Sequence, residues 1–246
     1  MAISSNSLFH FTNSLNDIKK IFKTGFQPSY CMESNNMAYP MISFCDIPLS
    51  QAKNHFEQYG KYVIGLKKEW GVKSKLNPVF YLSENSYIES QIYNAITLCN
   101  KLSDDDDITP IQSKIFELKS LPGDILRFSK PYEGALVRKG ETFDDYKFYN
   151  EREWRFVPEM EFDGIKPALY VKEYEKFKKK NPKKPHITNI SLKFKPEDIQ
   201  YIIVENESDI TKILKFLSEI DGWSSHKKIQ LLFTKILTST QIYQDM

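Results

Sequence analysis

The stretch of sequence that says most about the fold is a strand-like run of charged and aromatic residues, Tyr149-Asn150-Glu151-Arg152-Glu153-Trp154-Arg155-Phe156. Successive side chains of a β-strand point to opposite faces of a sheet. We therefore expect Glu151, Glu153 and Arg155 to share one face, and Arg152, Trp154 and Phe156 to share the other. Because Trp154 lies beside an apolar neighbour on its face, it is predicted to pack in the core.

The charges of this run have two interpretations. Two neighbouring carboxylates raise each other's pKa, whereas a nearby arginine lowers the pKa of both. Groups whose pKa is perturbed in this way are often found in functional clefts. The alternative is an edge strand whose charges are solvated or paired with one another. The run by itself leaves both interpretations open.

Composition restricts the class of protein. The chain has 246 residues, of which 41% are hydrophobic and 27% are charged, and this composition predicts a globular protein. Its formal net charge of +2 is too small to attract nucleic acid or a membrane surface through the electrostatic field of the whole protein. Cys31, Cys45 and Cys99 share no CxxC spacing, which argues against a disulfide framework and a cysteine zinc site. No metal site, no membrane span and a reducing cytoplasmic location are therefore expected.

Hydrophobic periodicity and turn residues predict an alternating order of strands and helices. The expected strands cover residues 8–12, 41–45, 62–66, 79–82, 146–157, 190–194 and 199–204, and the expected helices cover 15–23, 51–59, 85–102, 208–220 and 227–237. Residues 172–186 are expected to form a flexible lysine-rich connection. The acid run 104–107 is expected to be a solvated loop, with a further helical segment at 114–120.

These elements predict an α+β fold with mixed, mostly antiparallel sheets and flanking helices. The chain is expected to form a single domain over residues 1–246. A helical insertion is expected around 84–120, and a helical C-terminal segment is expected over 207–246.

Two strand motifs resemble those of ADP-ribosyltransferase domains. They are Leu8-Phe9-His10-Phe11-Thr12, followed by a helix that ends at Gly25, and Ile42-Ser43-Phe44-Cys45-Asp46. The resemblance implies an ADP-ribosyltransferase-like fold with NAD as substrate, and it gives Glu153 the place of the glutamate that steadies an oxocarbenium-like transition state. The sequence departs from the best-known pattern, since His10 stands where that pattern has arginine.

The resemblance also implies a role for each candidate site residue. Glu153 and His10 would be catalytic, and His10, Thr12 and Ser43 would line the NAD pocket. Tyr62, or alternatively Tyr81, would stack on nicotinamide, and Arg155 or Arg152 would hold the glutamate or a phosphate. We therefore predict that His10, Ser43 and Glu153 converge on one cleft.

A longer set of motifs resembles the AbiGi family of abortive phage resistance proteins. The motifs are Ser7-Leu8-Phe9-His10-Phe11-Thr12, Tyr39-Pro40-Met41-Ile42-Ser43-Phe44-Cys45-Asp46-Ile47-Pro48-Leu49-Ser50, Tyr149-Asn150-Glu151-Arg152-Glu153-Trp154-Arg155 and Phe233-Thr234-Lys235-Ile236-Leu237. This resemblance implies a bacterial anti-phage role as the antitoxin component of an operon pair. A protein partner encoded in the same operon is then expected.

Two alternatives to an enzyme follow from the same sequence. In the first, the charged strand is a buried ion-pair network in a binding module, and the C-terminal helices dock a toxin through apolar side chains, namely Phe216, Leu217, Leu231, Leu232 and Ile236. In the second, the lysine-rich loop from Lys178 to Lys184 contacts nucleic acid.

Overall fold

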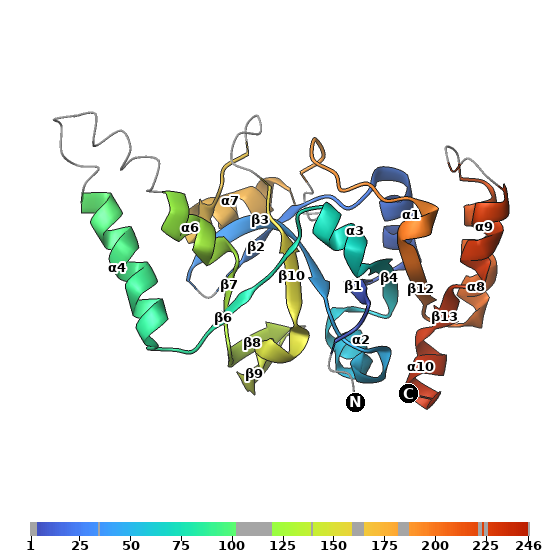
Figure 1. Cartoon of the computed structure of the whole chain (residues 1–246), viewed down its shortest axis with the longest axis horizontal. Coiled ribbons are helices and arrows are strands. Elements are labelled where there is room, and N and C mark those ends of the chain that lie inside the picture. Colours follow the sequence, from blue (N-terminus) through green and yellow to red (C-terminus); the bar gives the residue numbers. More distant parts are fainter. Residues whose placement is uncertain are drawn as a thin grey trace.

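The computed structural model describes residues 4–33, 35–101, 120–138, 140–158, 165–181, 187–220, 223 and 226–245, and its centre is a nine-stranded sheet (Figure 1). The strands follow the order β13-β12-β4-β1-β3-β10-β5, and β2 and β11 also pair with β3. Their bounds are β1 Ser7–Thr12, β2 Ser29–Met32, β3 Met37–Cys45, β4 Tyr62–Lys67, β5 Asn77–Pro78, β10 Glu153–Phe156, β11 Leu169–Tyr170, β12 Ile199–Val204 and β13 Ile236–Thr238.

The described pairs in this sheet are antiparallel except for the parallel pair β12–β13. Two small sheets lie outside it, parallel β6 (Phe80–Leu82) with β7 (Ser129–Pro131), and antiparallel β8 (Gly134–Arg138) with β9 (Glu141–Tyr146). The prediction of an α+β fold with a mixed, mostly antiparallel sheet is confirmed.

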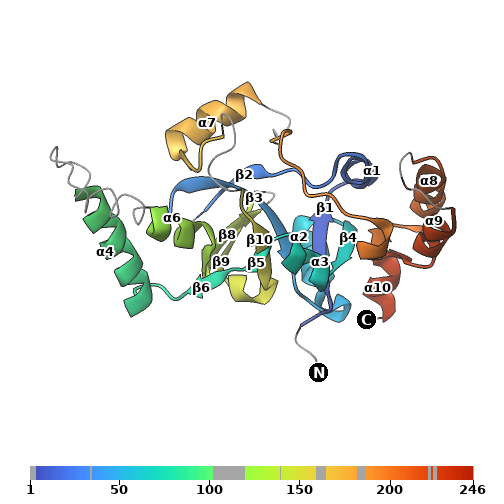
Figure 2. The same ribbon diagram turned by 45° about the horizontal axis from the view of Figure 1, so that its top comes forward.

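Helices cover both faces of the sheet and extend beyond its edge (Figure 2). Their bounds are α1 Leu15–Thr24, α2 Lys53–Tyr59, α3 Lys68–Lys73, α4 Tyr87–Lys101, α6 Ser120–Arg127, α7 Val171–Lys180, α8 Glu207–Ser218, α9 His226–Phe233 and α10 Ser239–Asp245, with 3₁₀ turns η1 Leu49–Gln51, η2 Phe148–Glu151 and η3 Pro196–Asp198. Among the helices that the structure describes, none is long and apolar enough to span a membrane.

The alternation of side chains along the strands produces two cores. Leu8 and Ile64 belong to the larger core, which α1, α3, α8 and α9 cover, whereas Phe9 and Val63 belong to the smaller core under α2 and α10. Each core buries apolar surface that stabilises the sheet from its own side. The sheet is therefore covered on both faces, and a strand residue's face decides which core it meets.

Glycines end α1 and α2 where the chain must turn tightly onto a neighbour. Gly25 has φ +77° and Gly60 has φ +114°, and residues that carry a Cβ rarely adopt such backbone angles. A Cβ on Gly60 would lie 2.1 Å from the Thr12 carbonyl oxygen, and one on Gly25 would lie 2.6 Å from that of Leu192. Both predicted helix ends are confirmed.

Several predicted elements differ from the structure. The charged run is no continuous strand, because η2 precedes β10 and Arg152 between them has φ +44°. Leu192 forms an isolated bridge with Phe26 where a strand was expected, and the last predicted helix ends at Phe233, where β13 follows. Pairing partners far along the chain impose these changes, and local propensity cannot reveal them.

The lysine-rich connection is also partly helical. The Glu173 carboxylate accepts a hydrogen bond from the backbone N–H of Tyr170 and so caps the start of α7. The helix continues to Lys180. The prediction of a flexible connection over residues 172–180 is wrong, and residues 182–186 lie outside the described residues. The acid run 104–107 and the helical segment expected at 114–119 also lie outside them.

Candidate functional site

The ladder between β3 and β10 determines which side chains can meet. Glu153 is opposite Cys45, Trp154 is opposite Phe44, and Arg155 is opposite Ser43. Since directly paired residues of an antiparallel ladder share a face, Ser43, Glu153 and Arg155 lie on the face of Cys45. Cys45 packs against the smaller core, and Phe44 belongs to the larger one.

His10 lies on the opposite face of the sheet. It is paired with Ile64 of the larger core, and Thr12 is paired with Tyr62 on the same face. The structure therefore brings Ser43, Glu153 and Arg155 together but separates them from His10, Thr12 and Tyr62. The prediction that His10, Ser43 and Glu153 converge on one cleft is wrong, because the pairing register places the even-numbered residues of β1 on the face of the sheet opposite the Ser43 and Glu153 side chains.

The residues on the His10 face make structural contacts. His10 Nδ1 lies 2.9 Å from the Ser43 carbonyl oxygen, and its ring packs edge-on against Phe26. Thr12 is buried and donates a hydrogen bond to the Tyr62 carbonyl oxygen at 3.3 Å. The Tyr62 hydroxyl donates to Asp209 at 2.7 Å, and burial together with that carboxylate raises the pKa of Tyr62.

On the other face, five charged residues form what we call the buried charge cluster: Glu33, Lys130, Glu151, Glu153 and Arg155. Glu153, which is 4% exposed, lies at its centre. Glu153 Oε1 accepts hydrogen bonds from the Ser43 hydroxyl at 2.6 Å and from Arg155 Nε at 2.7 Å. Its Oε2 accepts from Lys130 Nζ at 2.9 Å and from Arg155 Nη2 at 3.2 Å. Both carboxylate oxygens are thus fully engaged.

Arg155 connects the centre of the cluster to the loop after β2. Its side chain is 0% exposed, and its Nη2 donates to Glu33 Oε1 at 2.9 Å. Its Nη1 donates to the Arg127 carbonyl oxygen at 2.9 Å. A guanidinium in this position satisfies its donors in a fixed planar geometry, which suits a buried bridging role.

Lys130 of β7 connects Glu153 to Glu151. Its Nζ lies 2.5 Å from Glu151 Oε2 and 2.9 Å from Glu153 Oε2. The Tyr59 hydroxyl of α2 donates to Glu151 Oε1, and the Tyr81 hydroxyl of β6 accepts from the Glu153 backbone N–H at 2.7 Å. The cluster therefore ties the main sheet to the small β6–β7 sheet and to α2.

The electrostatics of the cluster keep its central charges ionised. Burial alone would raise the pKa of Glu153, but the charges of Lys130 and Arg155 and their hydrogen bonds hold it below its usual value. Burial likewise opposes the charge of Lys130, yet Glu153 and Glu151 raise its pKa well above normal. Glu33 at the margin has a raised pKa because its burial outweighs the attraction of Arg155.

His55 of α2 lies beside this cluster and was not anticipated from the sequence. Both ring nitrogens are buried without a hydrogen-bond partner among the described residues, and the ring packs near Phe11 and Tyr59. Burial lowers the pKa of His55, so its neutral form is favoured. Lys130, Glu33 and Tyr59 were also missed, because each lies in a separate element with no motif that links them.

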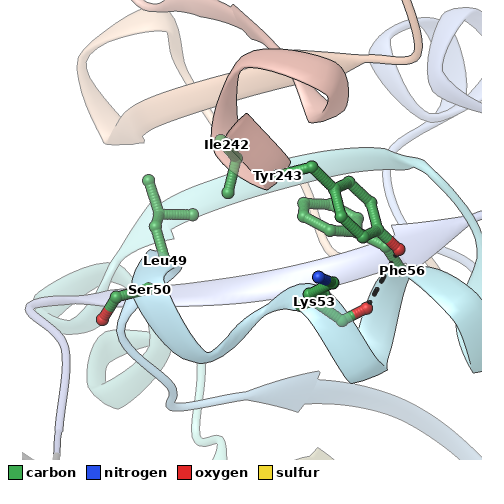
Figure 3. Close-up of a pocket in the computed structure, with 6 residues that line it drawn as sticks. All are labelled: Leu49, Ser50, Lys53, Phe56, Ile242 and Tyr243. Carbon is green, nitrogen blue, oxygen red and sulfur yellow. Dashed lines mark hydrogen bonds between the residues drawn. The ribbon is translucent and has the colours of Figure 1, made fainter. Parts of the chain in front are cut away.

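A small pocket lies between η1, α2 and α10 (Figure 3). Its volume is about 170 Å³, and its lining residues are Leu49, Ser50, Lys53, Phe56, Ile242 and Tyr243. The Tyr243 hydroxyl donates to the Lys53 carbonyl oxygen at 3.2 Å and closes one side. This volume is below that of ordinary small-molecule sites, and its lining includes none of the predicted site residues.

The predicted docking residues of the C-terminal helices mostly serve the protein's own core. Leu217 and Leu232 are buried in the larger core, and Phe216 and Ile236 pack against it. Leu231 differs, with 55% of its surface exposed. An amphipathic helix needs one apolar face for its own sheet, so the pattern alone could not distinguish core from interface.

Of the lysines predicted to contact nucleic acid, Lys178, Lys179 and Lys180 lie in the last turn of α7. Lys178 pairs with Glu175 at 2.7 Å and lies over the Tyr174 ring. Residues 182–184 of that predicted loop are outside the described part of the chain. The nucleic-acid contact stays a prediction.

Comparisons with known proteins give one consistent result. Residues 19–205 match the sequence model of a family described as "Putative abortive phage resistance protein AbiGi, antitoxin". The chain is also 30% identical over 228 residues to "Abortive phage resistance protein AbiGi" of Lactococcus lactis subsp. cremoris, a match that covers 84% of this chain and 88% of that protein. No solved structure matches the chain, so the expected likeness to ADP-ribosyltransferase domains stays a prediction.

Proposed function

Because the chain belongs to the AbiGi family of abortive phage resistance proteins, we propose that it is an antitoxin that binds and restrains a partner protein encoded in the same operon. In this proposal the chain is a binding module, and the buried charge cluster is its scaffold. Binding would hold the partner inactive until phage infection.

One observation carries the choice of binding over catalysis, namely the saturation of the Glu153 carboxylate. Both of its oxygens accept hydrogen bonds from Ser43, Lys130 and Arg155, and the side chain is almost fully buried. A carboxylate that stabilises a developing positive charge must face the reacting atom. Here the side chains of Lys130 and Arg155 already occupy the space next to the Glu153 carboxylate where such an atom would have to lie.

The physical role of such a network is to fix the arrangement of the elements that it joins. Removing one partner from a buried ion pair leaves an uncompensated charge at a high energetic cost. The cluster ties β10, β7 and the loop at Glu33 to one relative position. A rigid scaffold of this kind supports the presentation of a preformed binding surface.

The proposal is tested by stoichiometry. The partner encoded beside this chain is purified and its activity titrated with the chain, with and without NAD. We expect full inhibition near equal molar amounts, co-elution as one complex and no effect of NAD. Inhibition far below equal molar amounts that requires NAD would instead mean catalytic modification of the partner.

Transfer of ADP-ribose from NAD is the second candidate function. One observation favours it, since Ser43, Glu153 and Arg155 share one face with the Tyr81 hydroxyl beside them. It has less support than binding, because His10 and Thr12 lie behind the sheet. NAD turnover by the wild-type chain that disappears in Glu153→Gln, at unchanged stability, would favour this candidate.

A further inference from the structure

The helix α2 carries polar side-chain atoms that are buried without a hydrogen-bond partner. Among the described residues, the buried side-chain atoms that lack a partner are Nδ1 and Nε2 of His55 and Oε1 of Gln58, and both residues belong to α2. His55 is only 5% exposed. An unpaired polar group in a buried position costs free energy, and an unpaired charge there costs far more. The position therefore favours the neutral imidazole over the imidazolium.

The described surroundings of His55 offer no unengaged acceptor for a second ring proton. The centroid of its ring lies 5.6 Å from that of Phe11 on β1 and 5.8 Å from that of Tyr59 on α2. Glu151 of η2 and Lys130 of β7 are the charged groups that act on the ring from other elements, the first favouring protonation and the second opposing it. Glu151 Oε1 already accepts a hydrogen bond from the Tyr59 hydroxyl, and its Oε2 accepts one from Lys130 Nζ at 2.5 Å. An imidazolium would have to compete with these donors for the carboxylate.

The helix α2 depends on packing for its own stability. It has seven residues, and Ala52 at its N-cap makes no side-chain hydrogen bond to the first turn. So short a helix is at most marginally stable by itself in water. From α10, the Tyr243 ring packs against Phe56 and its hydroxyl donates to the Lys53 carbonyl oxygen (Figure 3), whereas η1 contributes no titratable side chain. The helix therefore persists while its packing against the sheet and α10 is intact.

We infer that His55 makes the packing of α2 dependent on pH: the helix stays packed while the imidazole is neutral and opens locally when the ring takes a second proton. The proton comes from solvent, and the imidazolium of the opened helix gains water as its hydrogen-bond partner. Opening also separates Tyr59 from Glu151 of the buried charge cluster and uncovers Phe56 of the smaller core. Native proteins open first in segments that few buried contacts hold in place.

The direction of the pH dependence follows from the burial of the ring. Burial lowers the pKa of His55 in the folded chain below the value of about 6.5 that a solvated histidine has. The ring therefore binds a proton more readily when α2 is open than when it is packed. The packed helix is fully favoured above about pH 6.5 and loses this advantage as the pH falls below that value. Between pH 7.5 and 5.5 the ratio of open to packed α2 should rise about tenfold.

Hydrogen exchange of the full chain, followed by mass spectrometry at pH 7.5 and 5.5 and corrected for the intrinsic effect of pH, tests the inference. The variants His55→Phe and His55→Leu have no ring nitrogen to protonate. Phe11→Leu is the matched control, because it weakens the packing around the same ring and changes no titratable group. From pH 7.5 to 5.5, we expect the protection of α2 to fall about tenfold in wild type and in the control, and by less than about twofold in both His55 variants.

Three outcomes would overturn the inference. The first is an equal loss of protection in wild type and in the His55 variants, since another group would then carry the effect. The second is a loss that extends equally over β4 and α8, because the proton would then unfold the whole chain. If neither His55 variant folds, NMR of the wild-type imidazole decides. A ring that takes up its proton near pH 6.5, as a solvated histidine does, is the third outcome, whereas a ring that stays neutral to lower pH supports the inference.

Discussion

The Ser43 hydroxyl donates a hydrogen bond of 2.6 Å to Glu153 Oε1 across 110 residues of sequence, and this contact marks the face of the sheet on which the carboxylate lies. From the opposite face, His10 Nδ1 meets the backbone carbonyl oxygen of the same Ser43. Ser43 thus stands between two residues that a catalytic site would have to bring together. Its hydroxyl and its carbonyl serve different faces.

This separation predicts which residues are energetically coupled. In a double-mutant cycle, Ser43→Ala and Glu153→Gln should show a coupling free energy of about 1 to 3 kcal/mol, because the two side chains are in direct contact. His10→Ala and Glu153→Gln should be additive within about 0.5 kcal/mol. Urea unfolding of the single and double variants measures both. Strong coupling of His10 to Glu153 would contradict their placement on opposite faces.

Glu153→Gln alone should reduce the free energy of unfolding by about 3 to 5 kcal/mol. The change removes the carboxylate that Lys130 and Arg155 share, so the buried Lys130 keeps only Glu151 and the buried Arg155 keeps only Glu33 as its anionic partner. Glu84→Gln on the surface is the control and should change stability by less than about 0.5 kcal/mol. A Glu153→Gln protein as stable as wild type would mean that the cluster does not hold the fold.

Trp154→Ala should reduce the free energy of unfolding by about 2 to 3 kcal/mol. The ring packs against the larger core but is only partly buried, so the loss should be smaller than the roughly 3 to 5 kcal/mol of a fully buried tryptophan. Thermal and urea unfolding measure it. An effect below about 1 kcal/mol would show that the ring contributes little to the core.

Stability should fall in alkaline solution, because two buried groups hold their protons more tightly in the folded chain than in the unfolded chain. Burial and the Glu151 charge raise the pKa of Tyr59, and the pKa of Lys130 is also raised. Above about pH 10 the unfolded chain releases protons that the folded chain retains, so stability is full below that pH and decreases above it. Each group contributes a slope of about 1.4 kcal/mol per pH unit.

Between pH 10 and 11.5, Tyr59→Phe should reduce the slope of unfolding free energy against pH by about 1.4 kcal/mol per pH unit, which corresponds to about one proton. Tyr87→Phe at an exposed position should leave the slope unchanged. Unfolding free energies measured by urea titration at intervals of pH give the slope directly. An unchanged slope in Tyr59→Phe would contradict the hydrogen bond between Tyr59 and Glu151.

Local sequence was sufficient to predict the elements that carry strong signals of their own. The polar cap at Ser14 and the terminal Gly25 delimit α1, and the β-branched run before Lys67 gives β4. The alternation of Glu153, Trp154 and Arg155 correctly separated the charged face of β10 from the aromatic face. These features depend on residues close together in the chain.

The sequence by itself determined the fold class, the family and the fact that Glu153 and Arg155 would share a face. Only the tertiary structure decided that His10 lies behind the sheet and that Lys130 lies between Glu151 and Glu153. The physical reason is that a shift of one residue in strand register exchanges the two faces, and no local preference fixes that register. Long-range pairing therefore assembled the buried charge cluster from residues that lie far apart in the sequence.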